Sequence, residues 1–138
     1  MSERFIICHF MHSAAVAKRI ASLLDVESHL LDCHTFPDQE SLVRAPDVDA
    51  ETAFIVSSLD EPDCKIVPLL IAADALRRRG ARRVVLVAPY LAYMRQDCAF
   101  RTGEPVSQRV LAGVLDSSFD GLITVEPHLH RISALSEI

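Results

Sequence analysis

Short apolar runs alternate with amphipathic stretches along the chain, and this pattern predicts an α/β domain. Strand-like composition, rich in Val, Ile, Leu and Phe, occurs at residues 4–10, 29–35, 52–59, 83–87 and 121–125. Apolar residues at helical spacing predict helices at residues 13–24, 63–80 and 107–115. Because strands and helices alternate, we expect a mostly parallel sheet with right-handed crossovers and helices on both faces. Residues 41–45 alternate in polarity and predict a short hairpin or flap.

The first and third of these helices have similar starting signals. A serine precedes each apolar pattern, so Ser13 and Ser107 are the expected N-caps. The apolar stripes expected to face the core are Val16, Ile20, Leu23 and Leu24 in the first helix, and Val110, Leu111, Val114 and Leu115 in the third.

The second helix contains a proline, which makes its start ambiguous. It begins at Asp63 or just after it, or only near Val67, which would place Pro68 at the first helical position, where proline is tolerated. Gly80 is the expected stop signal.

Composition narrows the class of protein. The chain has 138 residues, half of them hydrophobic, which is enough for one domain with a core. A net charge of −5 and 6% aromatic residues argue against a nucleic-acid partner. The four cysteines lie far apart, no signal segment opens the chain, and no apolar run is long enough to span a membrane, so a soluble cytoplasmic protein is expected.

The most informative segment is residues 88–107 (APYLAYMRQDCAFRTGEPVS), which follows a buried-type strand. It is long for a strand-to-helix connection, and such loops are usually functional or mobile. In open α/β sheets, ligands bind beyond the carboxyl ends of the strands, where this loop lies. Its polar and aromatic side chains are Tyr90, Tyr93, Arg95, Gln96, Asp97, Arg101 and Glu104. Its arginines and Gln96 could hold a polyphosphate, whereas the alternative is a surface loop that packs on the sheet edge.

Two other segments follow predicted strands and carry chemistry. Residues 36–40 (FPDQE) combine an aromatic ring with two acids, which could orient an adenine amino group or a metal-bound water; a solvated turn is the simpler interpretation. Residues 126–130 (EPHLH) place His128 and His130 where they could bind a divalent metal or phosphate, or simply lie in a surface loop.

Two clusters favour structural interpretations. Cysteines and histidines at residues 8–12 and 33–34 resemble zinc ligands, but neighbours in a strand point to opposite faces, which disfavours a shared metal. Five arginines at residues 77–83 cluster at the C-terminus of the second helix and are expected to form a solvated basic surface that complements the helix dipole, although a regulatory anion site is the alternative.

These segments occur in the order found in one known family. FPDQE, IAADALRRRGA, VVLVAPYLAYMRQD, EPVSQRVLAGVL and ITVEPHLHR together resemble the N-terminal half of a ribose-phosphate pyrophosphokinase. The resemblance covers about residues 36–130 and implies a phosphoribosyltransferase-like α/β fold, with residues 1–138 as the N-terminal ATP-binding domain. It also implies an enzyme that transfers the diphosphate of Mg-ATP to the C1 hydroxyl of ribose 5-phosphate.

The resemblance assigns roles to individual residues. Arg95 and Gln96 match residues that bind ATP, Asp97 completes that motif, and Arg101 is the one basic residue in the following lid. His128 matches a residue that helps to place Mg²⁺, with His130 as a possible second ligand. The matches to Phe36, Asp38 and Glu40 form an adenine pocket contributed by a neighbouring subunit, which implies a homo-oligomer.

The chain also departs from the family pattern, which points to a divergent branch. Gln39 stands where the family has a glycine, Glu126 and Pro127 replace an acid and leucine pair, and the lid is poor in basic residues. Because the ribose 5-phosphate loop and the catalytic lysine belong to the family's second half, we expect this chain alone to be inactive. The alternatives are a stand-alone regulatory or assembly module and, less favoured, a phosphoribosyltransferase, whose phosphate loop is not visible here.

Overall fold

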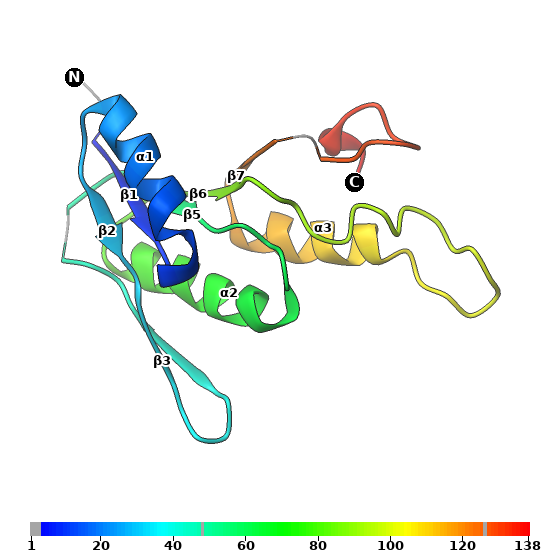
Figure 1. Cartoon of the computed structure of the whole chain (residues 1–138), viewed down its shortest axis with the longest axis horizontal. Coiled ribbons are helices and arrows are strands. Elements are labelled where there is room, and N and C mark those ends of the chain that lie inside the picture. The colour runs from blue at the N-terminus through cyan, green and yellow to red at the C-terminus, as the bar shows by residue number, and fades with distance from the viewer. Residues whose placement is uncertain (1–3, 48, 126) are drawn as a thin grey trace.

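The computed structural model describes residues 4–47, 49–125 and 127–138, and it confirms the predicted α/β architecture. Five parallel strands form one sheet in the order β2 (Ser28–Leu30), β1 (Phe5–His9), β5 (Thr52–Val56), β6 (Arg83–Ala88) and β7 (Gly121–Thr124). Helices lie on both faces, which gives three layers (Figure 1). Short 3-10 turns occupy Met11–Ser13 and Leu135–Glu137. Within the described residues, no helix has the length and apolar character needed to cross a membrane.

Alternation along the strands divides the core between the two faces of the sheet. On one face, Cys8, Ile55 and Leu86 are fully buried with residues of α2 (Asp63–Arg78) and α3 (Ser107–Ser118). On the other face, Ile7 and Val56 pack with α1 (Ala14–Leu24). Every central strand is therefore covered by apolar side chains, which explains its continuous hydrophobic sequence.

The apolar stripe predicted for α1 is wrong in its details. Val16, Leu23 and Leu24 are exposed, and the residues buried against the sheet are Ala17 and Ala21, with Ile20 partly buried. Small alanine side chains let the helix backbone approach the strands closely, and this contact outweighs the burial of larger side chains one position away.

The predicted cap of α1 is right in position but not in interaction. Ser13 is the N-cap residue, yet its side chain makes no capping hydrogen bond. Its Oγ instead accepts a hydrogen bond from the backbone N–H of Ser58, at 3.1 Å. The predicted cap of α3 is also displaced by one residue, since Val106 is the N-cap and Ser107 is the first helical residue.

Helix α2 begins at Asp63, so the alternative start near Val67 is wrong. Pro68 lies inside the helix and removes one backbone hydrogen bond, a change that costs about 3 kcal/mol in a helix interior. Burial of apolar residues beyond the proline offsets this cost; they are Leu69, Ala72, Ala73 and Leu76. The helix ends before Gly80, as predicted, and Gly80 has a φ of 105°.

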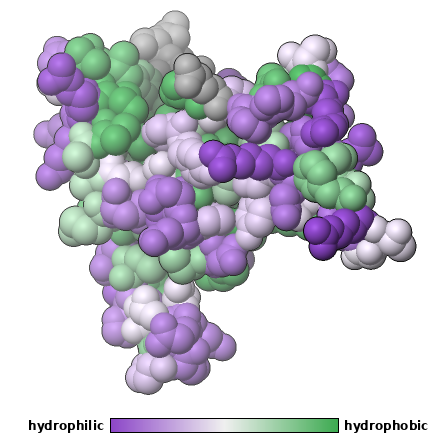
Figure 2. All heavy atoms as spheres, turned by 45° about the vertical axis from the view of Figure 1, so that its right-hand side comes forward, coloured by the Kyte–Doolittle hydropathy of each residue, from purple (hydrophilic) through white to green (hydrophobic). Residues whose placement is uncertain are grey.

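The strand predicted over residues 29–35 is two strands. β2 pairs with β1 in the sheet, and the chain then leaves the sheet at Leu31, whose side chain is buried. β3 (Asp32–Thr35) pairs antiparallel with β4 (Ser41–Arg44), which confirms the predicted flap. This hairpin projects from the body of the molecule, and its tip forms the mainly hydrophilic lower end in Figure 2 (Figures 1 and 2).

Three of the arginines at the end of α2 pair with carboxylates, so the surface predicted to be basic is partly neutralised. Arg78 Nε lies 2.6 Å from Asp74, and Arg77 Nη2 lies 2.9 Å from Asp120. Arg79 pairs with Asp47. The contacts with Asp120 and Asp47 connect the end of α2 to other segments of the chain. Because these arginines are already paired, less positive charge remains to bind a regulatory anion.

Candidate functional site

All five strands run in the same direction, so their carboxyl ends meet at one edge of the sheet. The chain reverses its direction of winding between β1 and β5, because β2 lies on one side of β1 and β6 and β7 lie beyond β5. Open α/β sheets bind ligands at such a point, outside the carboxyl ends of the strands. The connections at this edge are residues 10–13, 57–62, 89–106 and 125–134.

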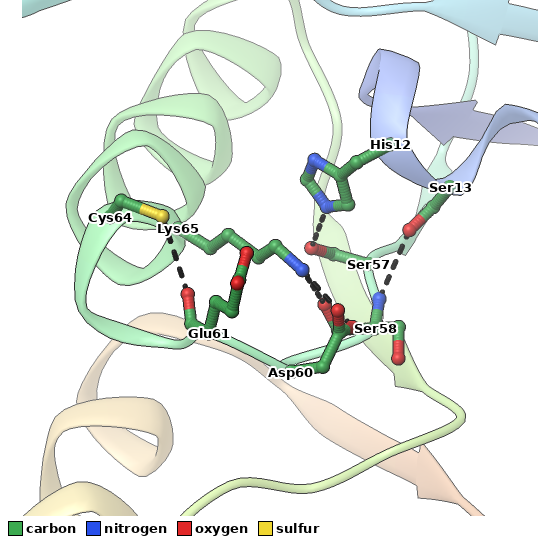
Figure 3. Close-up of polar contacts among 8 residues, drawn as sticks. All are labelled: His12, Ser13, Ser57, Ser58, Asp60, Glu61, Cys64 and Lys65. Atoms are coloured by element: carbon green, nitrogen blue, oxygen red, sulfur yellow. Dashed lines mark hydrogen bonds and ion pairs between the residues drawn. The ribbon is translucent and has the colours of Figure 1, made fainter.

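A polar cluster that the sequence analysis did not identify lies where β1 and β5 end (Figure 3). His12 Nε2 is 3.0 Å from the hydroxyl of Ser57, which is fully buried. Burial lowers the pKa of His12, the Lys65 ammonium lowers it further, and Asp60 partly opposes both. A neutral imidazole is therefore favoured here.

Lys65 holds this cluster together from the first turn of α2. Its ammonium donates to the Ser58 carbonyl at 3.1 Å and lies 3.0 Å from Asp60 Oδ1, with only 11% of its side chain exposed (Figure 3). Hydrogen bonds with Lys65 and Ser58 lower the pKa of Asp60. These contacts of Lys65 fix the loop after β5 against the first turn of α2.

The long loop predicted as a site lies one strand further along, between β6 and α3, and it has no regular secondary structure. Its base is fixed by burial of Leu91, Ala92 and Met94. Tyr93 adopts a φ of 63°, and its hydroxyl donates to the Asp63 carboxylate at the start of α2. This hydrogen bond raises the pKa of Tyr93. The base of the loop is therefore ordered by specific contacts.

Next along this loop stand Arg95 and Gln96, whose side chains are exposed. The Gln96 backbone is held at both ends, since its N–H donates to the Tyr93 carbonyl at 3.2 Å and its carbonyl accepts from the Gln108 N–H at 3.2 Å. Among the described residues, neither Arg95 nor Arg101 forms an ion pair. A fixed backbone with exposed, uncompensated guanidinium groups suits the binding of an anion.

The far end of the loop is a turn organised by its own carboxylate. Glu104 Oε2 accepts hydrogen bonds from the backbone N–H groups of Phe100 and Arg101, both at 3.0 Å. Gly103 has a φ of 89°, which favours glycine at this position. This turn extends away from the sheet in Figure 1.

The segment after β7 approaches the same loop. Among its described residues, His128 has a φ of 56° and its ring centroid lies 4.2 Å from that of His130. Arg131 Nη1 donates to Asp97 Oδ1 at 2.5 Å. The predicted loop is thus in direct contact with Arg131, the residue that follows the predicted histidine segment. Glu126, the acid of the EPHLH segment, lies outside the described residues.

The third predicted segment, residues 36–40, lies at the tip of the hairpin. Gln39 adopts a positive φ of 73°, a conformation that glycine adopts freely and that other residues adopt at a cost. Asp38 Oδ1 accepts the Glu40 N–H at 3.1 Å, and Phe36 is 39% exposed. In Figure 1 the hairpin of β3 and β4 and the loop of residues 89–106 project in different directions.

Comparison with known proteins decides the family. A model of the N-terminal domain of ribose phosphate pyrophosphokinase matches residues 5–118. The chain belongs to this family. Two ribose-phosphate pyrophosphokinases are similar to it in sequence: that of Methanopyrus kandleri is 40% identical over 114 residues, and that of Halobacterium salinarum is 44% identical over 95 residues. These matches cover 82% and 68% of this chain, and 39% and 34% of the relatives.

The fold of this pyrophosphokinase-family chain agrees with a solved relative. It matches the crystal structure of phosphoribosylpyrophosphate synthetase from Mycobacterium smegmatis with a TM-score of 0.83 and 27% identity, over 96% of this chain and 46% of that one. The fold predicted from the resemblance is therefore confirmed. The chain spans less than half the length of each of these three relatives.

Proposed function

We propose that this chain binds Mg-ATP as the nucleotide-binding part of a ribose-phosphate pyrophosphokinase. In that reaction, the C1 hydroxyl oxygen of ribose 5-phosphate attacks the β-phosphorus of ATP and loses its proton, the bond from that phosphorus to the α-phosphate oxygen breaks, and AMP leaves. The relatives named as ribose-phosphate pyrophosphokinases support this activity.

The observation that carries the proposal is the meeting of two segments at the carboxyl edge of the sheet. The loop with Arg95 and Gln96 and the segment with His128 follow adjacent parallel strands, β6 and β7. The contact of 2.5 Å between Asp97 and Arg131 joins them. Exposed guanidinium groups at the carboxyl edge of the sheet can neutralise the charge of a polyphosphate, and imidazole groups can form hydrogen bonds with its oxygens.

Magnesium is the proposed cofactor, carried in with the nucleotide. Among the described residues, no group of three or more His, Cys, Asp or Glu side chains could hold a metal ion. This is compatible with Mg²⁺, which keeps several waters and binds through few protein groups together with substrate phosphates. His128 would contact a magnesium-bound water or a phosphate oxygen, with His130 beside it. When bound, the ion offsets the negative charge that develops on the phosphate oxygens.

We further propose that the adenine pocket is completed by a second copy of the chain. Phe36, Asp38 and Glu40 carry an aromatic face and acceptors suited to an adenine base, but they lie on the projecting hairpin. The separation of hairpin and loop in Figure 1 favours contact with the loop of a neighbour. As a lid, residues 95–104 would then cover the phosphates and exclude water from them.

Calorimetric titration of the chain with Mg-ATP tests the proposed site. Arg95→Ala removes a charge-assisted contact worth about 1.5 to 3 kcal/mol, so we expect binding weakened by about 10- to 100-fold. Arg19→Ala, which removes an exposed arginine on α1, is the matched control and should bind normally. Equal affinity of Arg95→Ala and the unmodified chain would refute the site.

A further inference from the structure

Arg131, which lies in the segment after β7, contacts the loop that follows β6. Its guanidinium Nη1 lies 2.5 Å from Asp97 Oδ1, and its Cζ lies 5.7 Å from the centroid of the Phe100 ring. One arginine therefore contacts two positions of the loop, one on each side of Cys98. No motif in the sequence relates residue 131 to residue 97, which is 34 positions away.

The two partners of this ion pair differ greatly in exposure. The side chain of Asp97 is 2% exposed, whereas that of Arg131 is 54% exposed. A carboxylate buried to this extent is expensive to leave without a counterion, so the arginine fixes where Asp97 can lie. With its carboxylate enclosed, Asp97 is poorly placed to contact nucleotide itself, although it immediately follows Arg95 and Gln96.

We propose that Arg131 is a positioning residue of the nucleotide site, an inference that rests on the proposed function. By holding Asp97, it fixes the backbone from which Arg95 and Gln96 project. Because Arg131 is three residues after His128, the same contact fixes the distance between the nucleotide loop and the histidine segment. The two halves of the phosphate-binding site are thus joined before any ligand arrives, which lowers the entropic cost of ordering them on binding.

The chemistry of the contact favours arginine over lysine. A guanidinium is planar and weakly hydrated, so it can donate to the carboxylate while its face lies near the aromatic ring of Phe100. A lysine at residue 131 would keep the charge but lose the planar contact. We therefore expect Arg131→Lys to recover part of the function that Arg131→Ala loses.

Nucleotide affinity is the first measurement, made on the 138-residue chain by titration with Mg-ATP. Arg131→Ala should weaken binding by about tenfold or more, as is usual for partners that orient a binding group. Arg131→Lys should be intermediate, and Arg78→Ala, which breaks an exposed ion pair on α2, should bind normally. In an Asp97→Asn background, Arg131→Ala should have little further effect, because both changes break the same contact.

Two results would overturn the role. Unchanged affinity of Arg131→Ala, when Arg95→Ala has lost binding, would show that the contact does not position the site. Full additivity of Arg131→Ala and Asp97→Asn would mean that Arg131 contacts the phosphates directly.

Hydrogen exchange measured without nucleotide tests the positioning role of Arg131 independently of nucleotide binding. The measurement remains informative if the Arg131→Ala variant is less stable than the unmodified chain. Exchange at residues 95–104 should be faster in Arg131→Ala and in Asp97→Asn than in Arg78→Ala, while the exchange of β5 and β6 stays the same. If the unmodified chain failed to bind Mg-ATP, the proposed function would be refuted. Faster exchange of residues 95–104 in Arg131→Ala would still support the inference that the contact with Asp97 fixes the loop. Unchanged exchange of the loop would overturn it.

Discussion

The proposed sharing of the nucleotide site between two chains makes a quantitative prediction for mixtures of defective chains. One variant, Arg95→Ala, has a defective loop, and the other, Phe36→Ala, has a defective hairpin tip. In one molecule these positions lie on projections that point in different directions (Figure 1). A complete site then needs the loop of one chain and the hairpin of another, so each variant carries the half that the other lacks.

The expected size of the effect follows from this arrangement. Loss of a charged contact at Arg95 costs about 1.5 to 3 kcal/mol, and loss of an aromatic stacking partner at Phe36 costs about 1 to 3 kcal/mol. At Mg-ATP concentrations near the normal dissociation constant, each variant alone should thus be nearly empty. In an equal mixture after subunit exchange, a site is intact when its loop and its hairpin both come from the competent variant, which occurs in about one quarter of sites in a symmetric assembly.

The assay is calorimetric titration of each variant, of the mixture and of the unmodified chain, with sedimentation to establish assembly. A stoichiometry in the mixture of about one quarter of the normal value supports the shared site. A mixture that binds no better than either variant alone refutes it. So does an unmodified chain that binds Mg-ATP as a monomer, because then no neighbour supplies the hairpin.

Three further predictions concern stability. Burial lowers the pKa of His12, so the unfolded chain binds a proton at His12 more readily, and the free energy of unfolding should fall as the pH drops below about 6.5. In urea unfolding, the His12→Gln variant should show a smaller fall with pH than the unmodified chain. The exposed control His34→Gln should show the same fall as the unmodified chain. Asp120→Ala leaves the buried N–H of Val84 without its acceptor at 2.8 Å and should lower the free energy of unfolding by about 1 to 3 kcal/mol, whereas Asp120→Asn, which keeps an acceptor, should lose less. Gln39→Gly should raise the free energy of unfolding by about 0.5 kcal/mol, because glycine removes the strain of a left-handed backbone at residue 39, and this gain outweighs the greater conformational entropy that glycine loses on folding. A decrease in the free energy of unfolding would contradict this account.

The elements and their order were predictable because they depend on local patterns. Continuous apolar runs located β1, β5, β6 and β7, and helical spacing located the three helices. Details that depend on packing between elements were not. Which face of α1 is buried was decided by how closely Ala17 and Ala21 let the helix approach the sheet, and residue hydrophobicity alone pointed to exposed Leu23. Pro68 lies inside α2 because tertiary burial offsets its local cost.

The candidate site shows the same division between local and long-range information. The loop after β6 could be found from its length and its position after a strand. The Lys65 interactions with Ser58 and Asp60 could not, because the sequence does not show that the first turn of α2 folds back over the loop that precedes it.

Long-range contacts also change how the base-poor loop is understood. The sequence places only Arg101 in the segment after Asp97, which leaves the loop short of cations. The fold supplies another from residue 131, and its contact with a carboxylate that is 2% exposed means that this charge is used to hold the loop rather than to attract phosphate. Arg95 and Arg101 then remain as the exposed guanidinium groups of the loop without an ion pair among the described residues. Because the loop has few exposed cations and a prearranged backbone, we expect the nucleotide affinity to change more on the substitution Arg131→Ala than on an increase in ionic strength.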